Sequence, residues 1–322
     1  MDDAARRYPL SQKMPAGQAL LLILRRLFET MEANEAGLRE GLDPESLHDF
    51  RVAVRRTRCA FGQVENVLPA PVLVSFRPRF AWLGQVTGAT RDMDVYLLRF
   101  CAYRDSLPET ARDDLEPLHH FLLRQQKRER RKMLRSLDTR RYGDLLRDWK
   151  AFLETGPDPA ASPPGAALPV RETADARIII AFRRVMRKGK AIDIDSPASA
   201  LHELRIACKK LRYLVEFFQS LYPPGRIRKA IRDLKILQDS LGSFQDLQVQ
   251  TDSLRRFAAQ MADEGPVPAK TLLAMGMLIG DLHRHQGRTR EEFGERFDKF
   301  SRKPNRRIWT QTFRSTGEKN GG

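Results

Sequence analysis

The sequence is poor in cysteine and in long apolar runs. Its three cysteines, Cys59, Cys101 and Cys208, are an odd number without a CxxC spacing, so we expect reduced core or boundary residues and no disulfide framework. The longest aliphatic run, residues 19–24, is too short to span a bilayer and ends at two arginines. Because no charged segment with a small-residue cleavage site precedes it, the sequence predicts no secretory signal, no membrane anchor and a cytoplasmic protein.

Strand patterns are also missing. Apolar residues recur at helical spacing in both halves of the chain, and we find no convincing alternating run flanked by hairpin turns. The sequence therefore predicts an all-α fold. Pro44, Pro69 and Pro108 divide the first half into four helices. The predicted helices of the second half are 172–190, 197–221, 225–261 and 267–300. Two four-helix bundles are the simplest interpretation.

A stretch rich in proline and glycine lies midway along the chain. Residues 155–170 contain five prolines and two glycines, a composition that cannot continue a helix and suits an extended connector. The predicted organisation is a flexible N-terminal arm (1–15), a first helical-bundle repeat (16–154), a linker (155–170), a second repeat (171–310) and a flexible tail (311–322). Residues 16–310 would together form one domain.

Positive charge dominates the sequence. Its 57 Lys and Arg against 41 Asp and Glu give a formal net charge of +16 and a pI near 10.1. Because the planar arginine fork binds phosphate oxygens in pairs, the arginine-rich excess indicates a polyanionic partner, either a phosphate chain or a nucleic acid. The alternative is that many of these arginines only solvate helix faces.

One cationic segment occurs twice. Residues 47–58 (LHDFRVAVRRTR) return as residues 201–212 (LHELRIACKKLR), with five identical positions and four conservative replacements. The same offset of 154 residues pairs Asp92 with Asp246 and Gly88 with Gly242, which indicates an internal duplication. A glycine inside a helix costs about 1 kcal/mol relative to alanine, so we interpret these two glycines as sites of close helix packing or of a bend.

The repeated segment is amphipathic when it is wound into a helix. Each copy places one histidine and three cations on a single stripe and apolar residues on the opposite side. The stripes contain His48, Arg51, Arg55 and Arg58 in the first copy and His202, Arg205, Lys209 and Arg212 in the second. Stacked like charges repel, and Asp92 and Asp246 are too few to neutralise both stripes, so we favour an anion-binding surface over a solvated face. Each histidine is either a conditional cation, favoured in its protonated form beside phosphate, or a structural residue.

A second basic set lies on the last predicted helix of each half. It comprises Arg124, Lys127, Arg128, Arg131 and Arg135, with Arg284 and Arg288 as a partial counterpart. A solvated face and a binding face are equally compatible with this pattern.

The chain resembles the CHAD family, the conserved histidine α-helical domain, over roughly residues 16–309. The resemblance rests on the paired His-x-x-Arg-x-x-x-[Arg/Lys]-[Arg/Lys]-x-Arg helices, each followed 40 residues later by Gly-x-x-x-Asp. It implies two four-helix bundles related by a pseudo-twofold axis, with a basic central channel that binds inorganic polyphosphate, and it implies neither catalysis nor a cofactor or metal. The motif carries over to His48, Arg51, Arg55, Arg56, Arg58, His202, Arg205, Lys209, Lys210 and Arg212. The second basic set adds Arg124, Lys127, Arg128, Arg131, Arg284 and Arg288.

Some members of this family carry a fused triphosphate-tunnel (CYTH) domain with an ExExK signature. No ExExK occurs in this sequence, so we expect a stand-alone member. The leading hypothesis is a non-catalytic protein that binds polyphosphate, with association to polyphosphate granules as a further hypothesis.

Two other function classes stay open. A basic helical module could bind RNA or DNA, although the stripes lack interleaved aromatic residues and no helix-turn-helix, zinc-finger or RNP signature occurs. Nucleic acid would then compete with polyphosphate, and we expect it to be the weaker competitor. An enzyme that transfers phosphate through His48 or His202 would lack a carboxylate cluster, a Walker loop and a His-Glu-x-x-His spacing.

Overall fold

The computed structural model describes residues 8–41, 43–63, 66–193 and 195–314. Helices make up nearly all of these residues, and no strand occurs among them, so the predicted all-α fold is confirmed. Within the same residues, no helix combines the length and the apolar character that a membrane crossing requires.

Short turns join the helices along both halves of the chain. The first half contains α1 (Ala16–Glu40), α2 (Pro44–Gln63), α3 (Ala70–Val86), α4 (Gly88–Asp105), α5 (Glu109–Arg112), α6 (Glu116–Leu137) and α7 (Arg140–Thr155). The second contains α8 (Val170–Lys190), α9 (Ala198–Phe218), α10 (Pro224–Glu264), α11 (Ala269–Ser301) and α12 (Lys303–Thr312). Short 3-10 turns are η1 (Asp113–Leu115), η2 (Pro159–Ala161), η3 (Pro164–Ala166) and η4 (Gln219–Leu221). The predicted bounds of α8 to α11 agree closely with these.

The first half is more broken than the sequence predicts. Thr87 separates α3 from α4 where the second half has the unbroken α10, and its Oγ1 donates to the carbonyl of Leu83 at 2.9 Å. The extended Thr139 divides α6 from α7, and the extended Arg302 divides α11 from α12. Gly88 is the first residue of α4, directly after the break at Thr87. At Gly242 the alternative of close packing does not hold, because a Cβ built there would meet nothing within 4 Å, and α10 continues through this position.

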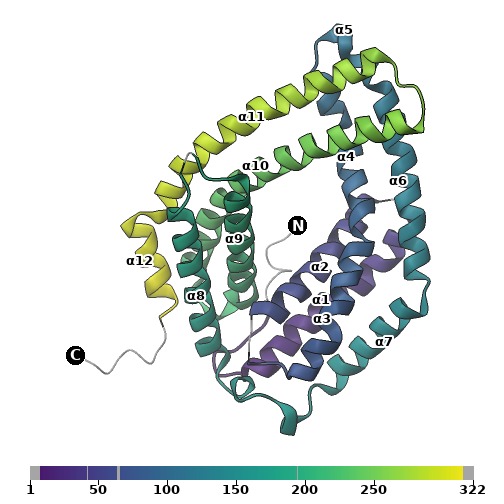
Figure 1. Ribbon diagram of the computed structural model, residues 1–322. Helices are drawn as coiled ribbons and strands as arrows, with labels where there is room; N and C mark the ends of the chain where they lie inside the picture. Colours follow the sequence, from purple (N-terminus) through teal and green to yellow (C-terminus); the bar gives the residue numbers. More distant parts are fainter. Residues whose placement is uncertain (1–7, 42, 64–65, 194, 315–322) are drawn as a thin grey trace.

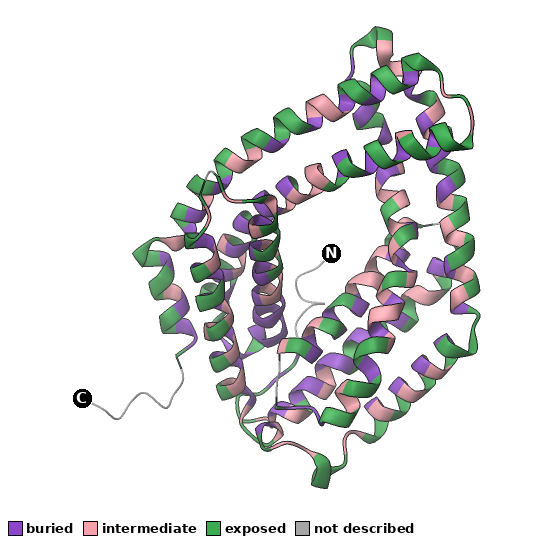
Figure 2. Ribbon diagram, viewed as in Figure 1, coloured by how far each residue is buried: buried purple, intermediate pink, exposed green. Residues whose placement is uncertain are grey.

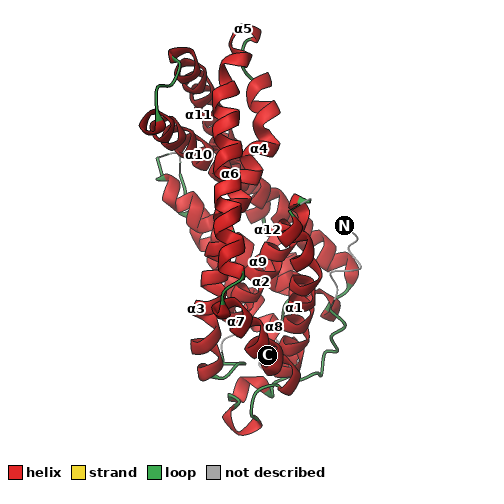
Figure 3. Ribbon diagram, turned by 90° about the vertical axis from the view of Figure 1, so that its right-hand side faces the viewer, coloured by secondary structure: helices red, strands yellow, loops and turns green. Residues whose placement is uncertain are grey.

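Figure 1 shows α10 and α11 side by side, running from the α8–α9 pair to the far ends of α4 and α6. At the opposite end α1 packs on α8 and α2 packs on α9. Helices of the two halves therefore contact one another at both ends of the molecule. The view turned by 90° shows the molecule as elongated, with α4, α6, α10 and α11 forming its narrow end (Figure 3).

Two hydrophobic clusters hold the helices together, and both combine the two halves of the chain. The larger one surrounds Trp149 from α7 and Trp309 from α12, which are both fully buried. The smaller one joins Tyr96 of α4 and Phe121 of α6 to Phe257 of α10, with ring centroids 5.1 and 5.6 Å from that of Phe257. Buried positions line the inner faces of these helices in Figure 2.

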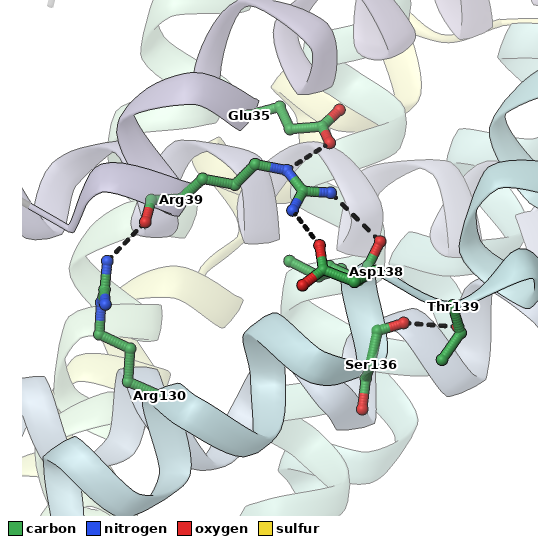
Figure 4. A network of polar contacts seen from close by, with 7 residues as sticks. Glu35, Arg39, Arg130, Ser136, Asp138 and Thr139 are labelled. Carbon is green, nitrogen blue, oxygen red and sulfur yellow. Dashed lines mark hydrogen bonds and ion pairs between the residues drawn. The ribbon is translucent and has the colours of Figure 1, made fainter.

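A polar network fixes the end of α1 against the turn between α6 and α7 (Figure 4). Arg39 donates to Glu35 at 2.9 Å, to Asp138 at 2.7 Å and to the carbonyl of Leu137 at 3.1 Å. Arg130 donates in turn to the carbonyl of Arg39. Because Arg39 and Arg130 make these contacts, we assign both of them a structural role.

The start of the described chain lies against the linker. The backbone N–H of Ala16 donates to the carbonyl of Leu168, and that of Val170 donates to Met14, each at 2.8 Å. Tyr8 and Leu10 are buried, which differs from the loose arm predicted over residues 8–15, because their apolar side chains join the larger cluster. Phe313 is buried in the same way within the predicted tail. Residues 1–7 and 315–322 lie outside the described residues.

Candidate functional site

The first cationic stripe follows α2 and faces α3 and α4. Arg51 is half-buried and donates to the carbonyl of Gly84 at 2.9 Å and to Thr87 Oγ1 at 3.0 Å. Burial lowers the pKa of the Arg51 guanidinium, against the opposing effect of Asp92. Arg58 is exposed, and a Cβ built on Gly84 would lie 2.9 Å from its Nη1. The break between α3 and α4 therefore positions the arginines of this stripe.

The two stripes meet where α2 packs against α9. Arg55 Nε donates to the hydroxyl of Tyr213 on α9 at 2.9 Å. Burial, together with the charges of Arg205, Arg55 and Arg212, lowers the pKa of Lys209 to about 8, while Asp246 opposes them. Arg55 of the first stripe therefore lies close to the partly buried Lys209 of the second stripe.

The second stripe follows α9 and faces α10. Arg205 lies 3.4 Å from Asp246, and His202 Nδ1 lies 2.8 Å from Gln245 Oε1. Arg212 Nε lies 3.4 Å from Glu216. Asp246 therefore supplies a carboxylate next to Arg205 of this stripe.

The two histidines have different neighbours at equivalent positions. Gln245, beside His202, corresponds by the offset of 154 residues to Arg91 in the first half. Burial and the charge of Arg91 lower the pKa of His48, which is half-buried. His202 is exposed. The repeat thus keeps both histidines and changes the charge next to them.

Two residues of the matched motif point away from the stripes. Arg56 is only 7% exposed and pairs with Glu216 at 2.9 Å, and its guanidinium lies over the rings of Tyr213 and Phe217. Lys210 lines a separate hollow beside α8. We therefore remove Arg56 and Lys210 from the candidate surface, because one is engaged in the core and the other faces another side.

A cavity of about 640 Å³ opens between α4, α6, α9 and α10, next to the second stripe. Its cationic lining consists of Arg99, Arg128, Arg205, Arg256 and His202. Its carboxylates are Asp92, Glu129 and Asp246. The lining combines residues from both halves, so the cavity depends on how the halves pack.

Arg99 and Arg256 were not singled out from the sequence. Arg99 follows Asp92 by seven residues and so shares its face of α4, a signal that could have indicated it. Arg256 has no cationic counterpart, because the equivalent position in the first half is Ala102. No pattern in the sequence marks it.

The second basic set is mostly placed elsewhere. Arg128 lines the cavity and lies 3.5 Å from Glu129. Arg124 pairs with Glu264 at 3.2 Å and Arg284 with Asp281 at 3.1 Å. Lys127, Arg131, Arg135 and Arg288 are likewise exposed and do not line the cavity. The structure therefore brings Arg128 to the stripes and leaves the others on outer faces.

Comparison with solved structures places this architecture among known folds. The CHAD domain from the plant Ricinus communis is 25% identical, with a TM-score of 0.73 over 90% of this chain and 93% of that one. PptA from Streptomyces chartreusis shares the fold at 18% identity, with a TM-score of 0.66 over 88% of this chain and 99% of that one. No curated protein matches the sequence.

The family comparison agrees with the paired motif. The CHAD domain family model matches residues 22–255, which is more than half of the chain and includes both histidine helices. The chain therefore belongs to the CHAD domain family.

Proposed function

We propose that this protein binds inorganic polyphosphate, without catalysis, along the junction of the α2 and α9 stripes. One observation carries the proposal: Arg55 of α2 reaches Tyr213 of α9 beside the half-buried Lys209, whose pKa is lowered to about 8 by burial and by the charges of Arg205, Arg55 and Arg212. Repulsion of this kind costs free energy in the unbound protein and is relieved by an anion. A phosphate chain supplies one anion after another along such a row.

The proposed contacts come from three neighbouring places. They are His48, Arg51, Arg55 and Arg58 on α2, His202, Arg205, Lys209 and Arg212 on α9, and Arg99, Arg128 and Arg256 in the cavity. Because Arg51 and Arg55 are held by hydrogen bonds to groups of the protein, part of the entropy cost of ordering them is already met on folding. Association with polyphosphate granules follows from the same proposal.

The direct test replaces one cation from each stripe. In Arg55→Gln/Lys209→Gln we expect polyphosphate affinity to fall by at least about tenfold, since hydrogen bonds to charged groups are lost at the junction. Lys299→Gln/Arg307→Gln is the matched control, because it removes the same two charges at exposed positions near α12. Calorimetric titration of both variants measures the effect. Equal losses in the two variants would show that only net charge matters and would contradict the proposed surface.

Nucleic acid is the competing polyanion. If phosphate spacing and charge along the stripes decide binding, RNA at an equal concentration of phosphate should displace labelled polyphosphate poorly. Efficient displacement by RNA would favour the nucleic-acid alternative instead.

A further inference from the structure

Asp246 lies between two arginines that come from opposite halves of the chain. Its carboxylate is 3.4 Å from Arg205 of α9 and 3.8 Å from Arg99 of α4. All three residues line the cavity between α4, α6, α9 and α10. The carboxylate of Asp246 therefore lies between cations that come from the two halves of the chain.

The contacts of Asp246 are loose. Charge-assisted hydrogen bonds between nitrogen and oxygen are about 2.7–2.9 Å long, which is shorter than both distances. Arg205 Nε is buried and makes no hydrogen bond within the described structure. The carboxylate side chain remains 46% exposed to the cavity. Asp246 thus leaves donor capacity of Arg205 unused.

A phosphate group fits this place better than the carboxylate does. It carries more acceptor oxygens than a carboxylate, and arginine forks bind it in a bidentate manner. The four arginines of the lining face three carboxylates, so the cavity already holds most of its own counter-charge. A ligand phosphate must compete with that counter-charge.

We propose that the carboxylate of Asp246 occupies a polyphosphate subsite between Arg99 and Arg205 in the unbound protein, where it substitutes for a phosphate. A phosphate of the ligand must displace the carboxylate to bind there. The inference rests on the proposed function and deepens it. Weakly charged anions do not displace the carboxylate, whereas a multiply charged phosphate chain does. Asp246 therefore determines how much negative charge a ligand must carry to bind at this subsite.

The test removes the charge of Asp246 and keeps its shape. In Asp246→Asn we expect tripolyphosphate to bind about three- to tenfold more tightly, because one repelling charge at contact distance is gone. Asp298→Asn is the matched control, since it changes the net charge equally at an exposed position on α11. The affinity of this control should change by less than about twofold, because Asp298 does not line the cavity and salt screens an exposed charge. Calorimetric titrations with tripolyphosphate and with long-chain polyphosphate measure both variants.

Unchanged or weaker tripolyphosphate binding by Asp246→Asn would overturn the inference. A second variant guards against a change of structure: in the Asp246→Asn background, Arg99→Gln should lower the affinity, and an unchanged affinity would also overturn the subsite. If the unmodified protein binds neither phosphate chain, the proposed function fails together with the inference. If it binds them and Asp246→Asn gains nothing, only the inference fails.

Discussion

Neighbouring arginines in the repeated motif have different roles. Arg55 reaches across to Tyr213 at the junction of the stripes, whereas Arg56 is buried against Glu216. Successive residues of a helix are about 100° apart, so a side chain directly after a stripe residue leaves that stripe. A buried pair of this kind is strongly destabilising to break and does not by itself add stability over apolar packing. The ion pair with Glu216 therefore compensates the charge of Arg56 inside the core.

The lowered pKa of Lys209 predicts a pH dependence for the proposed binding of polyphosphate. In the unbound protein this pKa is about 8, lowered by burial and by Arg205, Arg55 and Arg212. A bound phosphate favours the charged amine and raises the pKa, so binding near pH 8 should take up protons. Affinity should fall as the pH rises from about 8 toward the pKa of the complex. Titration of long-chain polyphosphate in buffers of different ionisation enthalpy measures the uptake.

Lys209→Arg is the control for this dependence. Arginine stays charged throughout this range, so the variant should bind without the proton uptake and with a flatter pH profile between about 7.5 and 9. The same profile in both proteins would show that another group titrates.

Sequence patterns identify the stripes and miss part of the cavity. His48, Arg51, Arg55 and Arg58 follow from helical projection alone, because all four lie on one helix. Arg99 and Arg256 belong to α4 and α10 and reach the site through packing between helices. A pattern within one segment does not contain that packing.

At the scale of whole helices, the sequence predicts most boundaries because prolines mark them. Pro44 is the first residue of α2, and Pro69 and Pro108 directly precede α3 and α5, positions where a missing N–H costs little. The break at Thr87 has no proline, and only the neighbouring Gly88 indicates it. There Arg51 donates to Thr87 Oγ1 and to the carbonyl of Gly84, contacts between helices that a pattern within one segment does not contain.

The helical glycines should respond in opposite ways to alanine. A Cβ built on Gly242 meets nothing within 4 Å, so Gly242→Ala should raise the free energy of unfolding by about 1 kcal/mol through helix propensity. Gly189→Ala in α8 is the contrasting substitution, because a Cβ at this position would overlap the ring of Phe297. Overpacking costs about 1–3 kcal/mol, which exceeds the gain in propensity.

Urea unfolding of both variants measures the difference. Gly189→Ala should be less stable than the unmodified protein and Gly242→Ala more stable. Stabilisation of both would show that Phe297 moves aside at little cost.

At the scale of the whole molecule, the hydrophobic clusters do not follow the halves of the sequence. Tyr8 contacts Phe217 with ring centroids 6.1 Å apart, and Tyr96 contacts Phe257. Each half alone would expose the apolar faces that these contacts cover. Burial of apolar surface provides most of the free energy of folding, so we expect the two halves to fold as one unit, with the junction of the α2 and α9 stripes formed only when both are present.

This shared core predicts what happens when the linker is cut. A protease site inserted after Ala160, which is exposed in η2, should allow cleavage into two fragments that remain associated, because both clusters hold them together. The cut protein should elute as one species in size-exclusion chromatography, unfold in a single transition and keep its polyphosphate affinity. The uncut insertion variant is the control for the inserted residues. Separation into two independently folded fragments, each with its own transition, would contradict the shared core and would place the binding surface within the halves instead of between them.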